Sequence, residues 1–220
     1  MTICIPLASE TNNDYLDLRF ALRGFEIYVK PDKIYVIGGM PGWIQGVEHI
    51  TATDRPEAHQ RERNMFEKLL LCPEDEFLMA HDDHFLMAPW QEQYGWDVSL
   101  LNKFYSLSRN SNYKKTVANT IRVAPKGNNF DIHVPMTMQR SLLYRMRSCR
   151  WDLPWGLCVK SIFSQFAGIK GRQMEDCKFR TPFILKDLKG RDWFSTADGV
   201  IDKCIPLMDK IYPKKSKFEI

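Results

Sequence analysis

The 220-residue sequence lacks the features that mark several classes of protein. It has no apolar run long enough for a membrane-spanning helix, so we expect no membrane span. It has no internal repeat, no low-complexity tract and no stretch of linker composition. No charged leader of the secretory type precedes the first expected strand.

The sequence is also poor in cysteine patterns. None of its six cysteines forms a C-x-x-C pair, and this missing spacing argues against a zinc site built from thiolates. Without a secretory leader, reduced thiols in a cytoplasmic protein are the expected state. The cysteines are Cys4, Cys72, Cys149, Cys158, Cys177 and Cys204.

The 31 basic residues slightly outnumber the 27 acidic residues. The net charge is +4, which is compatible with an anionic substrate and too small to require nucleic acid as a partner. Apolar residues make up 44% of the chain and aromatic residues 12%, enough for a sizeable core and unlike a disordered protein. The length fits one large domain or two small ones.

The most informative stretch surrounds two adjacent carboxylates, Asp82 and Asp83. They follow an apolar run, residues 77–80, that is short enough for a buried strand, and His81 and His84 flank them. Burying the run places the carboxylates at the carboxyl end of the strand, where ligands bind in open α/β sheets. Paired carboxylates repel each other, and a divalent cation relieves that repulsion. A helix cap or a solvated turn explains the same pair about as well.

The first 80 residues alternate between strand and helix patterns. Strands are predicted over residues 2–7, 33–37, 47–50 and 77–80, and helices over 15–25 and 61–71. The order β-α-β-β-α-β favours an α/β fold with a mostly parallel sheet flanked by helices. The first helix is expected to begin at one of four cap-forming residues, Thr11, Asn12, Asn13 and Asp14.

The second half of the chain shows a less regular alternation of strand and helix patterns. Its predicted elements are strands over 116–123, 130–135 and 181–185, and helices over 137–148, 157–166 and 200–211, the last restarting at Pro206. A lone histidine is more often structural than a ligand, but Asp131 and His133 would share one face of their strand, which modestly raises the case for a metal or phosphate site. Arg140, Arg145, Arg147 and Arg150 lie on or beside the helix over 137–148. They form either a solvated face or a phosphate-contacting face.

Several blocks of the chain, taken together, resemble one known family. Residues 17–23, 33–39 and 41–43 are similar to its amino-terminal pattern, roughly ELRYSLRS, KIYIVG and P-x-W-L. The strongest match is residues 77–85, against the pattern FLFMNDDHFL. Later matches are Asp131, His133 and Pro135 against D-I-H-x-P, and Gly156, Lys160, Ser161 and residues 174–178 against the last block.

These blocks resemble a GT-A-like glycosyltransferase family related to the Stealth-type capsular polysaccharide sugar-phosphotransferases and to short bacterial and phage glycosyltransferases. The chain departs from the pattern in two places. His81 stands where the family usually has asparagine, and the first strand lacks the TWVDG signature of true Stealth proteins. The second departure favours ordinary glycosyl transfer over sugar-phosphate transfer.

The resemblance implies a GT-A-like, Rossmann-like fold in one compact domain. Residues 1–125 would form the nucleotide-sugar-binding α/β part, and residues 126–220 a smaller acceptor-side part with the C-terminal helices. The implied activity is metal-dependent transfer of a sugar from a nucleotide-diphosphate sugar to an acceptor hydroxyl, on a polysaccharide or a modified DNA base. The alternatives are Stealth-like sugar-phosphate transfer and a protein that binds nucleotide or glycan without turnover.

The resemblance also implies roles for individual residues around a Mn²⁺ or Mg²⁺ ion. Asp83 would hold the metal, and Asp82 would help through the ribose or a water molecule. His133 would complete the metal shell or contact the diphosphate, with Asp131 orienting it.

The remaining predicted roles concern the nucleotide and the acceptor. Pro6, Ala8, Gly38 and Gly39 would line the base and ribose pocket, because glycine lets a ligand approach the backbone closely. Arg19 would contact the nucleotide or a phosphate, or else form a surface ion pair. The predicted catalytic base is Glu175 or Asp176, and a loop carboxylate at a helix start explains either residue equally well.

Overall fold

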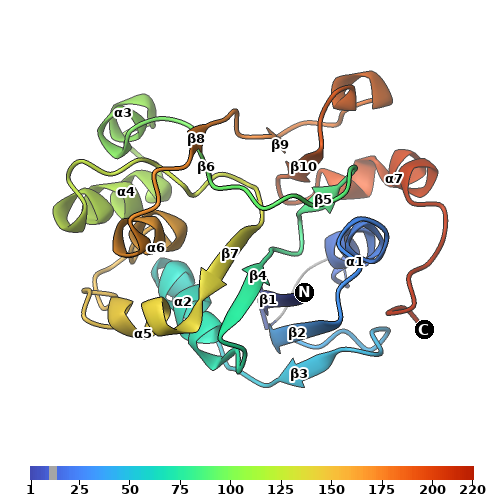
Figure 1. Cartoon of the computed structure of the whole chain (residues 1–220). Coiled ribbons are helices and arrows are strands. Elements are labelled where there is room, and N and C mark those ends of the chain that lie inside the picture. The colour runs from blue at the N-terminus through green and yellow to red at the C-terminus, as the bar shows by residue number, and fades with distance from the viewer. Residues whose placement is uncertain (10–13) are drawn as a thin grey trace.

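The computed structural model describes residues 1–9 and 14–220, and a five-stranded sheet lies at its centre. The strand order is β3-β2-β1-β4-β7, and only β7 runs antiparallel to its neighbour (Figure 1). The bounds are β1 (Thr2–Leu7), β2 (Lys33–Gly38), β3 (Glu48–Ile50), β4 (Glu76–Met79) and β7 (Met136–Gln139).

Helices cover both faces of this sheet, so its inner strands are apolar on both sides. Successive residues of β1 enter different cores: Ile3 and Ile5 lie in one, and Cys4 lies in the other. The first core includes residues of α1 (Leu16–Tyr28), η3 (Ile201–Lys203) and α7 (Ile205–Ile211). The second includes α2 (Arg61–Leu71), α3 (Leu100–Ser106), α4 (Asn112–Val123), α5 (Arg140–Met146) and α6 (Val159–Ala167).

A three-stranded sheet stands beyond the carboxyl end of β4. Its order is β5-β10-β9, and the chain reaches β5 directly from β4 through the turn that carries Asp82 and Asp83 (Figure 1). The bounds are β5 (Phe85–Leu86), β9 (Lys178–Phe179) and β10 (Trp193–Thr196). The remaining elements are the pair β6 (Gly95–Trp96) and β8 (Arg172–Gln173), and the short helices η1 (Ala58–Gln60) and η2 (Leu185–Leu188).

The elements predicted for the first 80 residues are confirmed, including the β-α-β-β-α-β order. Of the predicted caps for α1, Thr11, Asn12 and Asn13 lie outside the described residues, while Asp14 and the N-cap residue Tyr15 both have a positive φ. The restart before the last helix is also confirmed, because Pro206 lies in the first turn of α7. Among the described residues, no helix is both long enough and apolar enough to cross a membrane.

The strand predicted over residues 116–123 is wrong: these residues belong to α4. Their β-branched side chains favour a strand, but the buried ones recur at helical spacing and gain hydrogen bonds there. The Thr116 hydroxyl donates to the Trp155 carbonyl oxygen at 2.8 Å, and the Thr120 hydroxyl donates to the Thr116 carbonyl oxygen at 2.8 Å.

Two further strand predictions are also wrong. Residues 130–135 are irregular, and the strand lies just after them as β7, so that the helix predicted to start at Thr137 begins at Arg140. Residues 181–185 are not a strand, and strands form on either side of them as β9 and β10.

Two glycines allow β1 and β2 to end side by side. A Cβ atom on Gly38, whose φ is +119°, would lie 2.1 Å from the carbonyl oxygen of Leu7. A Cβ atom on Gly39 would lie 2.3 Å from the carbonyl oxygen of Ala8. The Cβ directions of these glycines therefore face the backbone of Leu7, the last residue of β1, and of Ala8, the residue after it.

Replacing Gly38 by alanine should destabilise the fold, because the new methyl group meets backbone and the positive φ is strained for alanine. We expect the free energy of unfolding, measured by urea titration, to fall by about 2 kcal/mol or more. Gly42→Ala is the matched control, since a Cβ atom there would meet nothing within 4 Å. Equal stability of the two variants would contradict this packing of the strand ends.

Candidate active site

A tight turn after β4 presents the two carboxylates. The backbone N–H of His84 donates to the His81 carbonyl oxygen at 3.3 Å, and the backbone N–H of His81 donates to Nδ1 of His84 at 3.1 Å. Because Nδ1 of His84 accepts, the ring proton lies on Nε2. Burial keeps both imidazoles neutral: it lowers the pKa of His81 to about 3, and that of His84 well below its ordinary value.

Asp83 is held by groups from the three-stranded sheet. Its Oδ2 atom accepts from the Ser195 hydroxyl at 2.8 Å and from Nζ of Lys178 at 3.1 Å. Burial is the largest single effect and acts to raise the pKa of Asp83, but the Lys178 ammonium, together with smaller contributions from neighbouring side chains, holds the pKa well below its usual range. Asp83 is therefore an ionised carboxylate at neutral pH.

Lys178 also reaches His133, so a chain of polar contacts crosses the site. Nζ of Lys178 donates to Nε2 of His133 at 3.1 Å, and Nδ1 of His133 donates to Oδ1 of Asp176 at 2.9 Å. The backbone N–H of His133 donates to the same oxygen at 3.1 Å. Burial opposes ionisation of Asp176, yet these bonds from His133 lower its pKa to about 2. Asp176 thus fixes the orientation and the tautomer of His133.

A buried lysine holds the loop that carries His133. The side chain of Lys160, near the start of α6, is almost fully buried and donates to the carbonyl oxygens of Ile132 and Val134, the latter at 3.1 Å. These two residues flank His133 directly. The irregular path of this loop is therefore satisfied by an ammonium group instead of strand pairing.

The prediction that Asp131 orients His133 is wrong. The Asp131 carboxylate is bonded to the start of α6 instead. It accepts from the Ser161 hydroxyl at 2.9 Å and from the backbone N–H of Lys160 at 3.3 Å. A carboxylate is favourable at a helix N-terminus, where backbone N–H groups lack helical partners. Asp176 makes the contact to His133 that was expected of Asp131.

Asp82 lies among other carboxylates. Burial, together with the charges of Asp83 and Asp17, raises the pKa of Asp82 to about 7. Asp17, on α1, accepts from the Thr196 hydroxyl at 3.1 Å. Arg61, the first residue of α2, supplies an opposite charge that acts on Asp82. The elements α1, α2, β9 and β10 therefore all place charged or polar groups around the end of β4.

The residues predicted to line the nucleotide pocket lie at the ends of β1 and β2. Pro6 is the residue before last in β1, and Ala8 follows the strand and is exposed. The loop after β1 is held by Asp54, which accepts from the Ser9 backbone N–H at 2.8 Å and from Nζ of buried Lys68 at 2.6 Å. Gly38 and Gly39 lie beside this loop. The structure thus brings the four predicted residues to one edge of the sheet.

Arg19 and Glu175 contact residues outside the cluster around Asp83. The guanidinium of Arg19 lies 4.1 Å from the ring centroid of Trp43 and 3.5 Å from Asp14, which is the ion-pair alternative that the sequence left open. The Glu175 side chain is 79% exposed, and its carboxylate lies 3.9 Å from Arg191. Of the two predicted bases, Glu175 is the one whose carboxylate is open to solvent, while Asp176 is engaged by His133.

The predicted metal ligands do not fit a metal ion as they lie. Asp83 and His133 do converge on one point, but the ammonium of Lys178 occupies it, and Asp131 is engaged at α6. Within residues 1–9 and 14–220, no group of three or more His, Cys, Asp or Glu side chains has an arrangement suited to a metal. The cysteines likewise remain separate thiols.

Comparisons with known proteins address the fold. No protein-family model matches the sequence, and no curated protein matches it. The structure is similar to that of the galactosyltransferase LgtC in complex with donor and acceptor sugar analogs. The TM-score is 0.51 and the identity 10%, with 99% of this chain and 97% of that chain covered. The chain therefore has the GT-A-like α/β fold that its sequence predicts.

Two further structures align less closely. An active-site mutant of LgtC gives a TM-score of 0.42 at 12% identity, covering 100% of this chain and 85% of that one. The apo form of the glycosyltransferase GlyE from Streptococcus pneumoniae TIGR4 gives 0.32 at 14% identity, covering 81% and 46%.

Sequence reasoning missed most of the cations of the site. Lys160 and residues 174–178 lay in blocks that resemble the family, yet no role followed for Lys160 or Lys178 from that likeness. Ser195 and Arg61 had no local signal, because only strand pairing and the start of α2 bring them to the carboxylates. Lys68 had no signal either, because it lies on the side of the predicted helix over 61–71 opposite to Phe66, Leu69 and Leu70.

Asp82→Asn should stabilise the protein in a pH-dependent way. Since the folded-state pKa of about 7 exceeds the unfolded value, the folded state loses relative stability as pH rises through this range. Asparagine has no such ionisation. In metal-free buffer we expect the variant to gain on the order of 1–2 kcal/mol at pH 8 and almost nothing at pH 4, measured by urea unfolding.

The control is Asp192→Asn, which removes an exposed carboxylate just before β10. We expect it to change stability equally little at both pH values. A gain for Asp82→Asn that is the same at pH 4 and pH 8 would contradict the raised pKa of Asp82.

Proposed function

We propose that this protein is a glycosyltransferase that moves a sugar from a nucleotide-diphosphate sugar to an acceptor hydroxyl. The observation that carries the proposal is the cluster at the end of β4, where Asp83, Lys178, His133 and Asp176 form one bonded chain. The cluster lies at the carboxyl ends of the parallel strands of a GT-A-like sheet, which is the ligand-binding edge of open α/β sheets.

The reaction requires a cation to stabilise the leaving diphosphate and a base to accept the hydroxyl proton. The bond between the anomeric carbon and the diphosphate oxygen breaks while the acceptor oxygen bonds to that carbon, so the leaving diphosphate gains negative charge. A cation beside it would stabilise that charge, and Lys178 and Arg61, which act on Asp83 and Asp82, are our candidates for that role. The hydroxyl proton passes to a base, for which solvent-open Glu175 is our candidate. Asp176 then acts as a positioning residue for His133.

The predicted roles around the nucleotide are kept in this proposal. Pro6, Ala8, Gly38 and Gly39 lie at the ends of β1 and β2, where they would border the base and ribose. Asp82 would contact a ribose hydroxyl. The division into a nucleotide-binding part, residues 1–125, and an acceptor-side part, residues 126–220, is kept as well, although the parts share sheets through β7 and β10.

A carbohydrate is favoured as acceptor over DNA by the position of the arginine-rich helix. Gln139, the last residue of β7, pairs with Glu76 at the amino end of β4, so α5 starts at the edge opposite Asp82. Arg140 pairs with Asp75 at 3.1 Å and Arg150 with Asp152 at 2.8 Å, as expected of a solvated face. Steep salt dependence of binding to duplex DNA would reverse this preference.

The products released from the donor decide the reaction class. Transfer of the sugar alone releases a nucleoside diphosphate, whereas transfer of a sugar phosphate cleaves the diphosphate and releases a nucleoside monophosphate. We would incubate the protein with a panel of nucleotide sugars and oligosaccharide acceptors, with and without MnCl₂, and separate the nucleotides by chromatography. Nucleoside diphosphate as the product supports the proposal, and monophosphate supports the Stealth-like alternative. No release of either from any donor supports a binding protein without turnover.

Asp83→Asn should lower kcat/KM for sugar transfer by about a hundredfold or more, because the amide leaves Lys178 without its anionic partner. Nucleoside diphosphate release measures the loss, and circular dichroism checks that the variant is folded. Asp192→Asn is the control, because it makes an equal change of charge at an exposed carboxylate that is not part of the hydrogen-bonded chain. Full activity of Asp83→Asn would remove this carboxylate from the mechanism.

A further inference from the structure

The ammonium of Lys178 lies at the point where Asp83 and His133 meet. Nζ is 3.1 Å from Oδ2 of Asp83 and 3.1 Å from Nε2 of His133. The side chains of the ion pair are only 14% and 18% exposed. These are two of the three residues from which the sequence predicts a divalent metal site, the third being Asp131, and a cation does bind them both. That cation belongs to the chain itself.

Strand register fixes this ammonium in place. Lys178 and Ser195 are direct partners in the parallel pairing of β9 with β10, so their side chains leave the sheet on the same face. Both side chains donate to the same oxygen of Asp83. β10 is paired in turn with β5 through Phe194 and Phe85, and Phe85 follows Asp83 by two residues. Moving the ammonium away would therefore break two partly buried hydrogen bonds.

An ammonium and a metal ion exclude each other at this point. A divalent ion bound to Asp83 and His133 would lie about 2.0–2.3 Å from the same two atoms. Two cations sharing these ligands would then be separated by only a few ångströms, with strong repulsion in a partly buried site. Mn²⁺ therefore has to displace Lys178 in order to bind.

The ammonium keeps one donor for a ligand. A lysine side chain has three N–H groups, and Asp83 and His133 use two of them. The third N–H can serve a phosphate oxygen, as lysine does in many phosphate sites. Asp83 and His133 do not compete for that donor, because both already accept from the other two.

We propose that Lys178 serves as the built-in cation for the donor diphosphate, so that diphosphate binding at this site needs no divalent metal. The inference rests on the proposed function for the identity of the ligand. It departs from the metal-dependent site that the sequence predicts, because Asp83 and His133 of that site hold a side-chain ammonium. The chain's own charge then replaces an exchangeable ion.

Binding experiments test this without any turnover. Calorimetric titration would measure the affinity of the intact protein for the diphosphates of uridine, guanosine, cytidine and adenosine, in EDTA and in 1 mM MnCl₂. We expect at least one of them to bind in EDTA, with an affinity that Mn²⁺ changes by less than about threefold. Binding that is about tenfold or more tighter with Mn²⁺ would overturn the inference and leave the proposed function standing. No binding in either buffer would overturn both.

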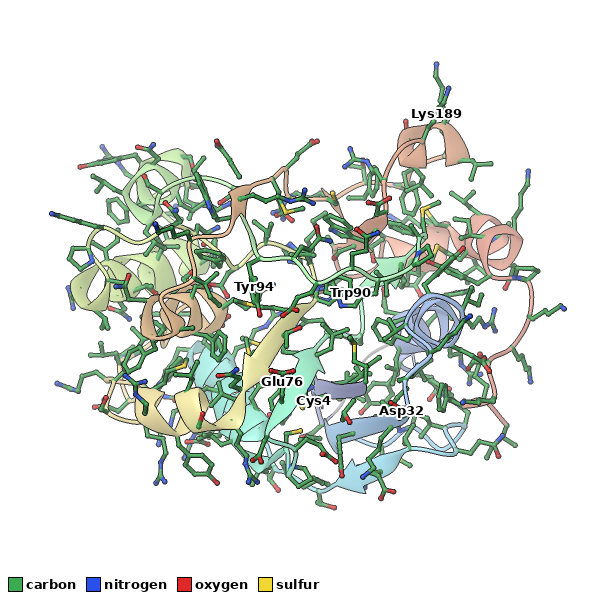
Figure 2. All side chains as sticks on the ribbon, in the orientation of Figure 1. Cys4, Asp32, Glu76, Trp90, Tyr94 and Lys189 are labelled. Carbon is green, nitrogen blue, oxygen red and sulfur yellow. The ribbon has the colours of Figure 1, made fainter. Side chains whose placement is uncertain are left out.

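Variants separate the role of Lys178 from that of charge in general. Lys178→Met keeps the apolar stem without the ammonium, and we expect it to weaken diphosphate binding in EDTA by about tenfold or more. Lys189→Ala is the control, because this lysine projects from the exposed turn after η2 (Figure 2) and its loss should leave affinity unchanged. Equal affinity of Lys178→Met and the unchanged protein in EDTA would overturn the inference.

Manganese alone provides a second readout. Electron paramagnetic resonance of free Mn²⁺ would measure metal binding without nucleotide. Because Lys178→Ala releases Asp83 and His133, we expect this variant to bind Mn²⁺ about tenfold more tightly than the unchanged protein. Tighter Mn²⁺ binding by the unchanged protein would mean that Lys178 does not occupy the metal position. The unchanged protein's titrations need no variant, so a variant that fails to fold leaves the test intact.

Discussion

The candidate site depends on the pairing of three short strands that are far apart in the sequence. β5 follows the carboxylate turn directly, β10 pairs with β5, and β9 pairs with β10. This order carries Ser195 and Lys178 to one oxygen of Asp83. A shift of one residue in β9 would turn Lys178 to the other face of the sheet. The register of a two-residue strand thus decides whether Asp83 has an ammonium beside it.

The hydrogen-bonding state of His133 follows from its surroundings. The Lys178 ammonium can only donate, so Nε2 is the acceptor in their contact, and Nδ1 carries the proton that is donated to Asp176. The loop that carries His133 has no strand pairing of its own, and buried Lys160 satisfies its carbonyl oxygens instead. Two lysines therefore act at different depths: Lys160 shapes the loop, and Lys178 occupies the point that the loop creates.

Local patterns predicted the first half of the fold and the place of the carboxylates. The apolar spacing in residues 2–7 and 61–71 reports burial directly, and burial decided the structure there. The same reasoning failed over residues 116–123, because β-branched residues favour a strand wherever tertiary hydrogen bonds do not decide otherwise. The sequence predicted that Asp83 and His133 meet. It did not predict Lys178 between them, since that contact depends on a strand pairing with no signal in the nearby residues.

A resident ammonium also explains the unequal behaviour of the two neighbouring carboxylates. Lys178 forms an ion pair with Asp83, which stays ionised, whereas burial and the charges of Asp83 and Asp17 outweigh the opposing charge of Arg61 and raise the pKa of Asp82 to about 7. A divalent ion would neutralise both and remove that rise. With a single charge, Asp82 is a poor neighbour for a diphosphate and a good one for a hydroxyl, because a carboxyl near its pKa can donate or accept. Under the proposed function, the phosphates would then lie on the Asp83 side of the turn and a ribose hydroxyl on the Asp82 side.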